Sequence, residues 1–258
     1  IDYRVFDSLN SSIAGSTQTK FEAGGLEYDQ LLLSVDGVKP LELGLVEPVN
    51  LAFGVEYRDE SFSVSAGEPA SYIGGGLAGK TPGSQGFPGF SPANVVDKSR
   101  NSWGAYVDVE GKLTEALSFG LAGRYEDYSD FGDQLTGKIS ARYDFSHAFA
   151  LRGAVSTGFR APALQQQYFS YTATNFVASA PPPGLLQTVK LRVDDPIAVA
   201  LGARPLEAET SVNYSFGGVF RTGGFELTVD AYQIDVDNRI VFTELLGTTR
   251  PSQDSATI

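Results

Sequence analysis

A period-two alternation of bulky apolar residues with small or polar residues recurs along this chain, and it limits the possible folds more than any other feature. In residues 49–58, VNLAFGVEYR, every second position holds valine, leucine, phenylalanine or tyrosine. Because successive side chains of a strand point to opposite faces, this pattern predicts a strand with one apolar face. The same pattern occurs in residues 117–127, 138–145, 149–159, 211–220 and 225–231, and more weakly in residues 102–111.

The connections between these segments alternate in length. Residues 112–117, 145–149 and 221–225 are tight links, whereas residues 59–101 and 160–208 are long loops. Short turns on one rim and long loops on the other are typical of an outer-membrane barrel, and strands of about ten residues can cross a tilted path through a bilayer. We therefore expect an all-β fold, an antiparallel transmembrane β-barrel segment of about eight strands, with both long loops extracellular.

A soluble β-sandwich is the alternative, since alternation alone fits both architectures. It fits less well, because a sandwich would have to bury the face that mixes charges with glycine, alanine and serine. Tyr57, Tyr125 and Phe159 fall near the long-loop ends, where an aromatic girdle is expected. The alternation changes face near Ala231, and either a bulge or a strand that rises clear of the membrane explains this.

The composition excludes several classes of protein. The chain has 19 basic and 31 acidic residues, a net charge of −12, and no basic stripe suited to nucleic acid. It has no cysteine, so disulfides and zinc–thiolate sites are excluded. It has no methionine and no signal peptide, so we expect a processed piece of a longer protein. No apolar run is long enough for a spanning helix, which leaves a spanning barrel open.

One stretch matches a nucleotide-binding motif. Residues 74–81, GGGLAGKT, fit the pattern G-x-x-x-x-G-K-[ST]. That motif needs a buried strand before it and a helix that begins at its lysine. Pro69 precedes the motif and Pro82 and Gly83 follow it, so we expect a glycine-rich surface loop instead.

The sequence offers no convincing metal or catalytic site. Asp127, Asp130 and Asp133 lack the pattern of a calcium loop, and residues 235–238 are expected to be a polar strand end. His147 is the only histidine and lies in a short link, where it favours neither a metal cluster nor a catalytic triad. We expect no bound metal, no cofactor and no enzymatic activity.

Residues 151–170, LRGAVSTGFRAPALQQQYFS, strongly resemble the barrel signature of TonB-dependent outer-membrane receptors. Residues 51–60, 123–132 and 227–240 also resemble segments of that family, in the same order, and the resemblance covers residues 26–245. It implies a 22-stranded barrel in the cell outer membrane, closed by a plug domain. It also implies energised uptake of a scarce ligand, such as a ferric siderophore, with the TonB complex, the receptor's own plug domain and the lipid bilayer as partners and no nucleic acid.

The chain departs from the complete family pattern in three ways. The plug domain is absent, no TonB-contacting box is visible, and the terminal PSQDSATI lacks a final aromatic residue. We therefore expect residues 1–258 to be a middle portion of the barrel. A passive porin, which would use the same wall without a plug, stays open as an alternative, as does a soluble β-sandwich adhesion module.

Charged residues alternate onto the face opposite the apolar one, where a large barrel encloses water or a plug. They are expected to brace the wall by pairing across strands, with contact to ligand or plug as the alternative. Arg160 is the strongest candidate for a further role, because its strand ends there and Pro162 removes a ladder donor. The predicted lumen-facing charges are Glu56, Arg58, Arg124, Glu126, Arg142, Arg152 and Arg160, together with Lys138 and Asp144.

Ligand capture is expected on the two long loops, because binding residues concentrate on loops held by a rigid scaffold. Aromatic side chains there offer rigid surface beside polar donors, and Lys80 offers a surface cation for an anionic chelate. The alternative is that these aromatic residues only pack the loops together. The candidate ligand-binding residues are Tyr72, Lys80, Phe87, Phe90, Tyr168, Phe169, Tyr171 and Phe176.

Overall fold

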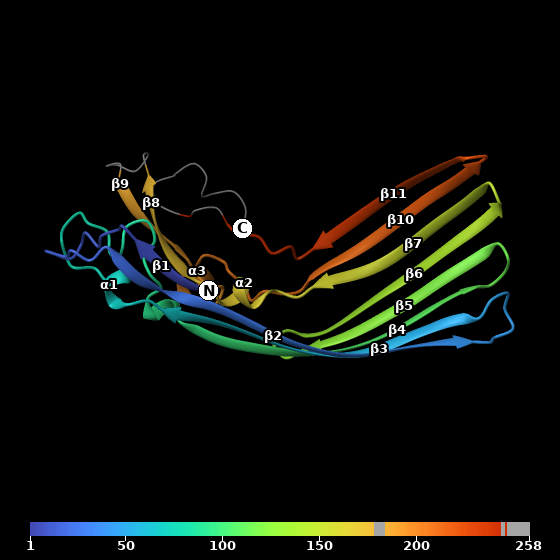
Figure 1. Cartoon of the computed structure of the whole chain (residues 1–258), viewed down its shortest axis with the longest axis horizontal. Coiled ribbons are helices and arrows are strands. Elements are labelled where there is room, and N and C mark those ends of the chain that lie inside the picture. The colour runs from blue at the N-terminus through green and yellow to red at the C-terminus, as the bar shows by residue number, and fades with distance from the viewer. Residues whose placement is uncertain (178–183, 244–245, 247–258) are drawn as a thin grey trace.

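The computed structural model describes residues 1–177, 184–243 and 246, and within them most of the chain forms one antiparallel sheet. Its nine strands follow the order β1-β2-β3-β4-β5-β6-β7-β10-β11. Figure 1 shows them side by side in a single curved layer. The sheet does not close into a barrel within the described residues. The strands are β1 (Asp2–Phe6), β2 (Lys20–Leu41), β3 (Val49–Ala66), β4 (Val96–Lys112), β5 (Leu117–Tyr128), β6 (Gly132–Ser146), β7 (Phe149–Arg160), β10 (Glu209–Thr222) and β11 (Phe225–Asp237).

The strand connections confirm the predicted alternation of short and long links. Turns at residues 113–116, 147–148 and 223–224 join neighbouring strands at one end of the sheet, which we call the turn end. The opposite, loop end carries residues 67–95 and 161–208, and Figure 1 shows the helices and the extra hairpin gathered there. The expected number of about eight strands is confirmed by eight long strands, to which the short β1 is added.

The predicted loop boundaries were wrong where the strands continue. Residues 59–66 and 96–101 were expected to be loop, but they form the paired ends of β3 and β4, from Asp59 opposite Asn101 to Val64 opposite Val96. Along residues 61–66 the apolar side chains Phe62 and Val64 lie on the same face as Arg58 and the serines lie on the opposite face, which reverses the arrangement in the rest of the strand, and residues 96–101 are mostly polar. The second long loop is also structured, with helices α2 (Leu164–Tyr168) and α3 (Pro196–Ala200) and the paired strands β8 (Tyr171–Val177) and β9 (Gly184–Lys190).

The register gives the sheet one apolar and one polar face. Leu121 lies between Val109 and Ile139 on neighbouring strands, and all three side chains share the apolar face. This face, which we call the outer face, remains exposed: Leu121 and Ile139 keep 46% and 65% of their surface accessible. Toward the loop end it finishes in aromatic residues, where the Tyr57 and Trp103 rings lie 4.6 Å apart. The predicted apolar face is therefore continuous across strands and uncovered.

The change of face near Ala231 has no bulge behind it. β10 and β11 pair without interruption from Thr210 opposite Asp237 to Thr222 opposite Phe225. Gln233 and Asp235 consequently continue the outer face of β11 beyond Ala231, and they lie opposite Tyr214 and Val212. Of the two explanations that the sequence left open, the bulge is excluded. The strand simply becomes polar on its outer face toward the loop end.

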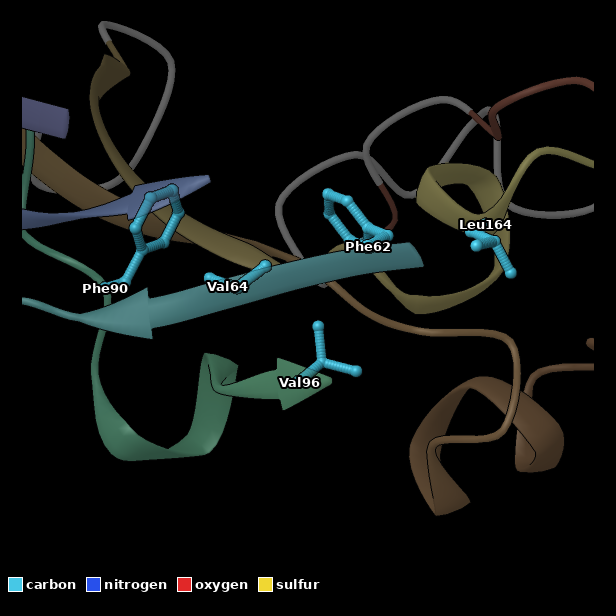
Figure 2. Close-up of a cluster of buried hydrophobic side chains, with 5 residues drawn as sticks. All are labelled: Phe62, Val64, Phe90, Val96 and Leu164. Atoms are coloured by element: carbon cyan, nitrogen blue, oxygen red, sulfur yellow. The ribbon is translucent and has the colours of Figure 1, made fainter. Parts of the chain in front are cut away.

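A hydrophobic cluster stabilises the loop end on the polar face, which we call the inner face. Phe62 and Val64 from β3, Val96 from β4, Phe90 from the first long loop and Leu164 from α2 are buried together. Figure 2 shows these five side chains, with Leu164 on its helix beyond Phe62 and Phe90 at the other side, near Val64. Because the sheet is a single layer, its loops supply the second layer of this core.

The N-terminal segment holds the first long loop in place. Asn10 is fully buried and donates from Nδ2 to the carbonyls of Ala70 and Ile73, at 2.9 Å each. Its Oδ1 accepts from the Ser12 backbone amide at 3.2 Å. Ser12 Oγ in turn accepts from the Gly75 amide at 2.9 Å. These bonds satisfy the buried polar groups and fix the helix α1 (Pro69–Tyr72) against residues 10–12.

None of the helices in the described residues is long and apolar enough to cross a membrane.

Candidate functional site

Charged side chains form a continuous row on the inner face of β3 and β5. Arg58 donates from Nη2 to Glu56 Oε1 at 2.9 Å, and Arg124 Nη2 lies 3.4 Å from the same oxygen. Arg124 also donates from Nε to Glu126 Oε1 at 2.5 Å. The Tyr128 hydroxyl donates to the other carboxylate oxygen of Glu126 at 2.7 Å. Four of the predicted lumen-facing charges thus alternate in sign along one bonded row.

The other predicted arginines on this face pair with different carboxylates. The closest distances are 2.6 Å for Arg142–Asp144, 2.6 Å for Arg152–Asp230 and 2.8 Å for Arg160–Glu209. Arg152 reaches Asp230 across β10 because Gly217 lies between them in the register, and a Cβ there would overlap the Asp230 carboxylate. The seven arginines and glutamates among the predicted lumen-facing charges share the inner face and have a carboxylate or arginine partner in the wall, whereas Lys138 has no ion-pair partner in the described residues. The pairs Arg124–Glu56, Arg152–Asp230 and Arg160–Glu209 join different strands and support the bracing role, whereas Arg142–Asp144 lies within β6. Contact with a ligand or plug stays a prediction.

Arg100 is a buried charge at the loop end that the sequence analysis missed. Its side chain is only 4% exposed, and it donates from Nε and Nη2 to Glu60 Oε2 at 2.9 and 2.7 Å. Nη1 donates to the Pro162 carbonyl at 2.7 Å. The Tyr28 hydroxyl donates to Glu60 Oε1 at 2.6 Å, and burial together with this bond raises the pKa of Tyr28 to about 12. Continuing the alternation from Ser102 back through Arg100 would have placed this charge on the inner face.

The aromatic candidates of the first long loop are held in packing contacts. Phe90 is 3% exposed, and its ring makes edge-to-face contacts with Phe87 at 5.6 Å and with Tyr3 at 5.8 Å. Tyr72 is half-buried at the end of α1. Lys80 is exposed, so it is the candidate in this loop whose polar group is open to solvent. For Phe90 in particular, the structure favours the packing role that the sequence left as the alternative.

The candidates of the second long loop form a shelf of aromatic rings, and two lysines lie over it. We define the aromatic shelf as Tyr168, Phe169 and Tyr171, which are partly buried, with the Phe169 and Tyr171 rings stacked at 5.5 Å. Lys98 Nζ lies 5.4 Å from the centre of the Tyr168 ring, and Lys190 Nζ lies 5.1 Å from the centre of the Phe169 ring. The structure thus brings together three predicted residues from one loop and adds two cations that the sequence analysis missed.

These two lysines have no acidic partner among the residues that the structure describes. Within the described part of the chain, neither Lys98 nor Lys190 has a carboxylate oxygen within ion-pair distance. Lys190 Nζ approaches only the Gln165 carbonyl, at 3.5 Å, and burial lowers the pKa of Lys190. Cation–π contact positions an ammonium group but does not neutralise it. The shelf therefore carries two positive charges that an anion can neutralise.

Phe176, the remaining candidate, lies in β8 opposite Leu185 in the register, and its side chain is outside the described residues. The terminal segment PSQDSATI also lies outside the described residues.

The nucleotide-motif stretch lies in a surface loop. Residues 74–81 follow α1 without an intervening strand, and no helix begins at Lys80. Across residues 1–177 and 184–243, no three acidic or histidine side chains gather in a way that could hold a metal ion. Asp130, a member of the aspartate triplet, instead lies 3.6 Å from Arg100 and accepts from Gln167 at 3.3 Å.

Comparison with known proteins gives the chain a family context. The family model described as TonB dependent receptor-like, beta-barrel matches residues 2–257. The ferric enterobactin receptor PirA of Pseudomonas aeruginosa is 25% identical over 243 residues, which cover 92% of this chain and 30% of that protein. A probable TonB-dependent siderophore receptor PirA of Acinetobacter baumannii is 24% identical over 153 residues, covering 59% of this chain and 19% of that protein.

The fold agrees with this match. The crystal structure of the siderophore receptor PirA from Acinetobacter baumannii has a TM-score of 0.57 to this chain at 18% identity, over 90% of this chain and 30% of that one. The chain thus spans less than a third of the length of the relatives described here.

Proposed function

This chain belongs to the TonB-dependent receptor β-barrel family, and from this premise we propose that it forms part of the wall and mouth of an outer-membrane receptor that imports an anionic ferric chelate. The observation that carries the proposal is the aromatic shelf with Lys98 and Lys190 beside it. By the mouth we mean the inner face of the sheet at its loop end, where the shelf lies against β3 and β4.

The chemistry of the shelf favours an anionic ligand with aromatic groups. Ring faces offer apolar stacking surface, and two ammonium groups that have no carboxylate partner in the described part of the chain add attraction for negative charge. The chain as a whole carries a net charge of −12, so the field of the wall opposes a distant anion. Local cations at the mouth are therefore needed for capture. A ferric tris-catecholate meets these requirements, since its catecholates outweigh the charge of the iron and present aromatic edges.

The two faces of the wall support the rest of the assignment. The exposed apolar outer face with its aromatic margin suits contact with the hydrocarbon of the outer membrane. The polar inner face would enclose a plug domain, and uptake would draw energy through the TonB complex. The described residues supply neither of these two partners. The assignment is to transport, in keeping with relatives that are named as receptors. No feature of the described residues favours a passive porin over this reading.

Uptake of radioactive iron by cells tests the proposal. Cells whose sole receptor for ferric enterobactin is the full-length protein should import the complex, and a protonophore should stop import while surface binding persists. Replacement of residues 168–176 by a Gly/Ser linker should abolish both binding and import. The matched control replaces Pro196–Ala200, a helix in the same loop without buried residues, and should keep both.

Import that continues in the presence of the protonophore would support the passive porin instead. Unchanged binding after replacement of residues 168–176 would move the ligand site to the plug or the lower wall. A folded barrel in each variant, recognised by its heat-resistant migration on a gel, is required for either conclusion.

A further inference from the structure

The segment that carries the aromatic shelf leaves its own strand and crosses the mouth. It begins after β7, yet α2 contacts β4 and β3, which lie three and four positions away from β7 in the sheet. The crossing is possible because only residues 129–131 connect β5 and β6, so no long loop stands in the way. Residues 161–171 therefore form an arm that folds inward over this hairpin, and Figure 1 shows α2 on the concave side of the sheet.

Arg100 connects the start of this arm to the wall. Its Nη1 donates to the Pro162 carbonyl at 2.7 Å, and the same guanidinium holds Glu60 through Nε and Nη2. The guanidinium also lies 5.5 Å from the centre of the Tyr128 ring and 3.6 Å from Asp130 on the hairpin below the arm. Arginine suits this position because its five donors lie in a rigid fork that can serve a carboxylate and a carbonyl together.

Two further contacts fix the arm along its length. Leu164 is 1% exposed and belongs to the buried cluster that includes Phe62 and Val96, whose side chains are drawn in Figure 2. At the far end, Asn94 Nδ2 donates to the Ser170 carbonyl at 3.2 Å and to its hydroxyl oxygen at 3.1 Å. The apolar contact is non-directional, whereas the hydrogen bonds set the direction of the backbone at each end. Tyr168 and Phe169 lie between these two ends.

We propose that Arg100 is a positioning residue that holds the arm inside the mouth and so fixes the place of Tyr168 and Phe169. It acts through the Pro162 carbonyl and touches no ligand itself. The position of the arm follows from the structure alone, while its consequence for ligand affinity rests on the proposed function. Arg160, only two residues before Pro162, has no such role, because its side chain is 58% exposed and pairs with Glu209 on β10.

The experiment compares two double variants of the full-length receptor. Arg100→Met with Glu60→Gln removes the contact to Pro162 without leaving the Glu60 carboxylate buried and unpaired. Asp130 keeps its bond from Gln167, and the new glutamine can still accept from Tyr28. Arg160→Met with Glu209→Gln is the matched control and removes an arginine–carboxylate pair at the base of the same arm. A nitroxide on Gln165→Cys reports the mobility of α2, in a chain that has no cysteine of its own.

We expect the nitroxide to be immobilised in the parent and in the Arg160 control, and mobile in the Arg100 double variant. Affinity for ferric enterobactin should fall at least about tenfold in the Arg100 double variant and stay unchanged in the Arg160 control, since only the first loses a charge-assisted hydrogen bond that orders the site. An equally immobilised nitroxide in the Arg100 variant would overturn the proposal. A mobile nitroxide with unchanged affinity for ferric enterobactin would refute the inference that the position of the arm determines ligand affinity.

The nitroxide measurement needs no ligand. If the parent receptor bound no ferric enterobactin, the proposed function would fail, while the mobility of the arm would still decide the role of Arg100.

Discussion

Replacement of Leu121 by arginine should destabilise the full-length receptor, because this side chain lies on the outer face in the middle of its strand. The outer-face residues of β5 run from Leu117 to Tyr125, eight residues apart, so about 27 Å of strand separates them. At a tilt of about 40° this length spans roughly 20 Å, close to the apolar band of an outer-membrane barrel. Leu121 is four residues from either end and thus near the midplane.

An arginine at the midplane of the lipid-facing surface costs about 2–4 kcal/mol. Ala122→Arg, one residue along, is the matched control, because the register places it on the inner face between Asp108 and Lys138. There the new charge has one opposite and one like neighbour and meets water, so its effect should stay within about 0.5 kcal/mol.

Both variants should be refolded into bilayers and unfolded with denaturant, with the folded fraction followed by heat-resistant migration on a gel. The structure predicts a lower free energy of unfolding for Leu121→Arg alone. Equal losses in the two variants would refute the assignment of the faces, and a larger loss for Ala122→Arg would mean that the polar face is the buried one.

Three further outcomes follow from particular residues. Burial lowers the pKa of Lys190, so affinity for an anionic chelate should fall as the pH rises through that pKa. Lys190→Met should weaken binding at neutral pH and remove this part of the pH dependence, which a binding titration over pH at constant ionic strength checks. Lys80→Ala with Thr81→Ala should leave nucleotide binding undetectable before and after the change, and ATP binding that disappears with Lys80 would overturn the loop assignment. Trp103→Ala should lower the free energy of unfolding by more than about 0.5 kcal/mol through loss of its contact with Tyr57, whereas an unchanged midpoint in denaturant would show that this outer-face contact contributes nothing.

The sequence predicted strands well where one face meets hydrocarbon and the other does not. Residues 117–127 were expected as a strand, and β5 spans Leu117–Tyr128. β2 was missed because Leu31, Leu32 and Leu33 are consecutive and hide the period-two pattern, although Leu32 lies on the inner face opposite Arg58. The loop-end parts of β3 and β4 were also missed, since there the outer face is polar while Phe62, Val64 and Val96 lie on the inner face, which reverses the pattern used to recognise the strands.

The site was predictable in composition but not in arrangement. Tyr168, Phe169 and Tyr171 were expected as a group because they are close in the sequence. Lys98 could not be added, since it reaches the shelf only because the arm crosses from β7 to β4, and Lys190 could not be added because only the pairing of β9 with β8 places it opposite Tyr171. The partners of the inner-face charges were equally hidden: Arg152 pairs with Asp230, 78 positions away, because a glycine on the strand between them leaves room.

The binding of two ferric chelates to the full-length receptor tests the central claim most directly. Affinity for ferric enterobactin and for a neutral ferric trishydroxamate should be measured in the parent, in Lys98→Met with Lys190→Met, and in Lys138→Met. Lys138 is the control because it is an exposed lysine on the inner face, away from the mouth, without an ion-pair partner in the described residues. The structure predicts that the double variant loses at least about tenfold in affinity for the anionic chelate, with no comparable loss for the neutral one or in the control. Equal losses for both chelates, or an equal loss in Lys138→Met, would contradict the assignment of the shelf and its two lysines as the anion-binding site.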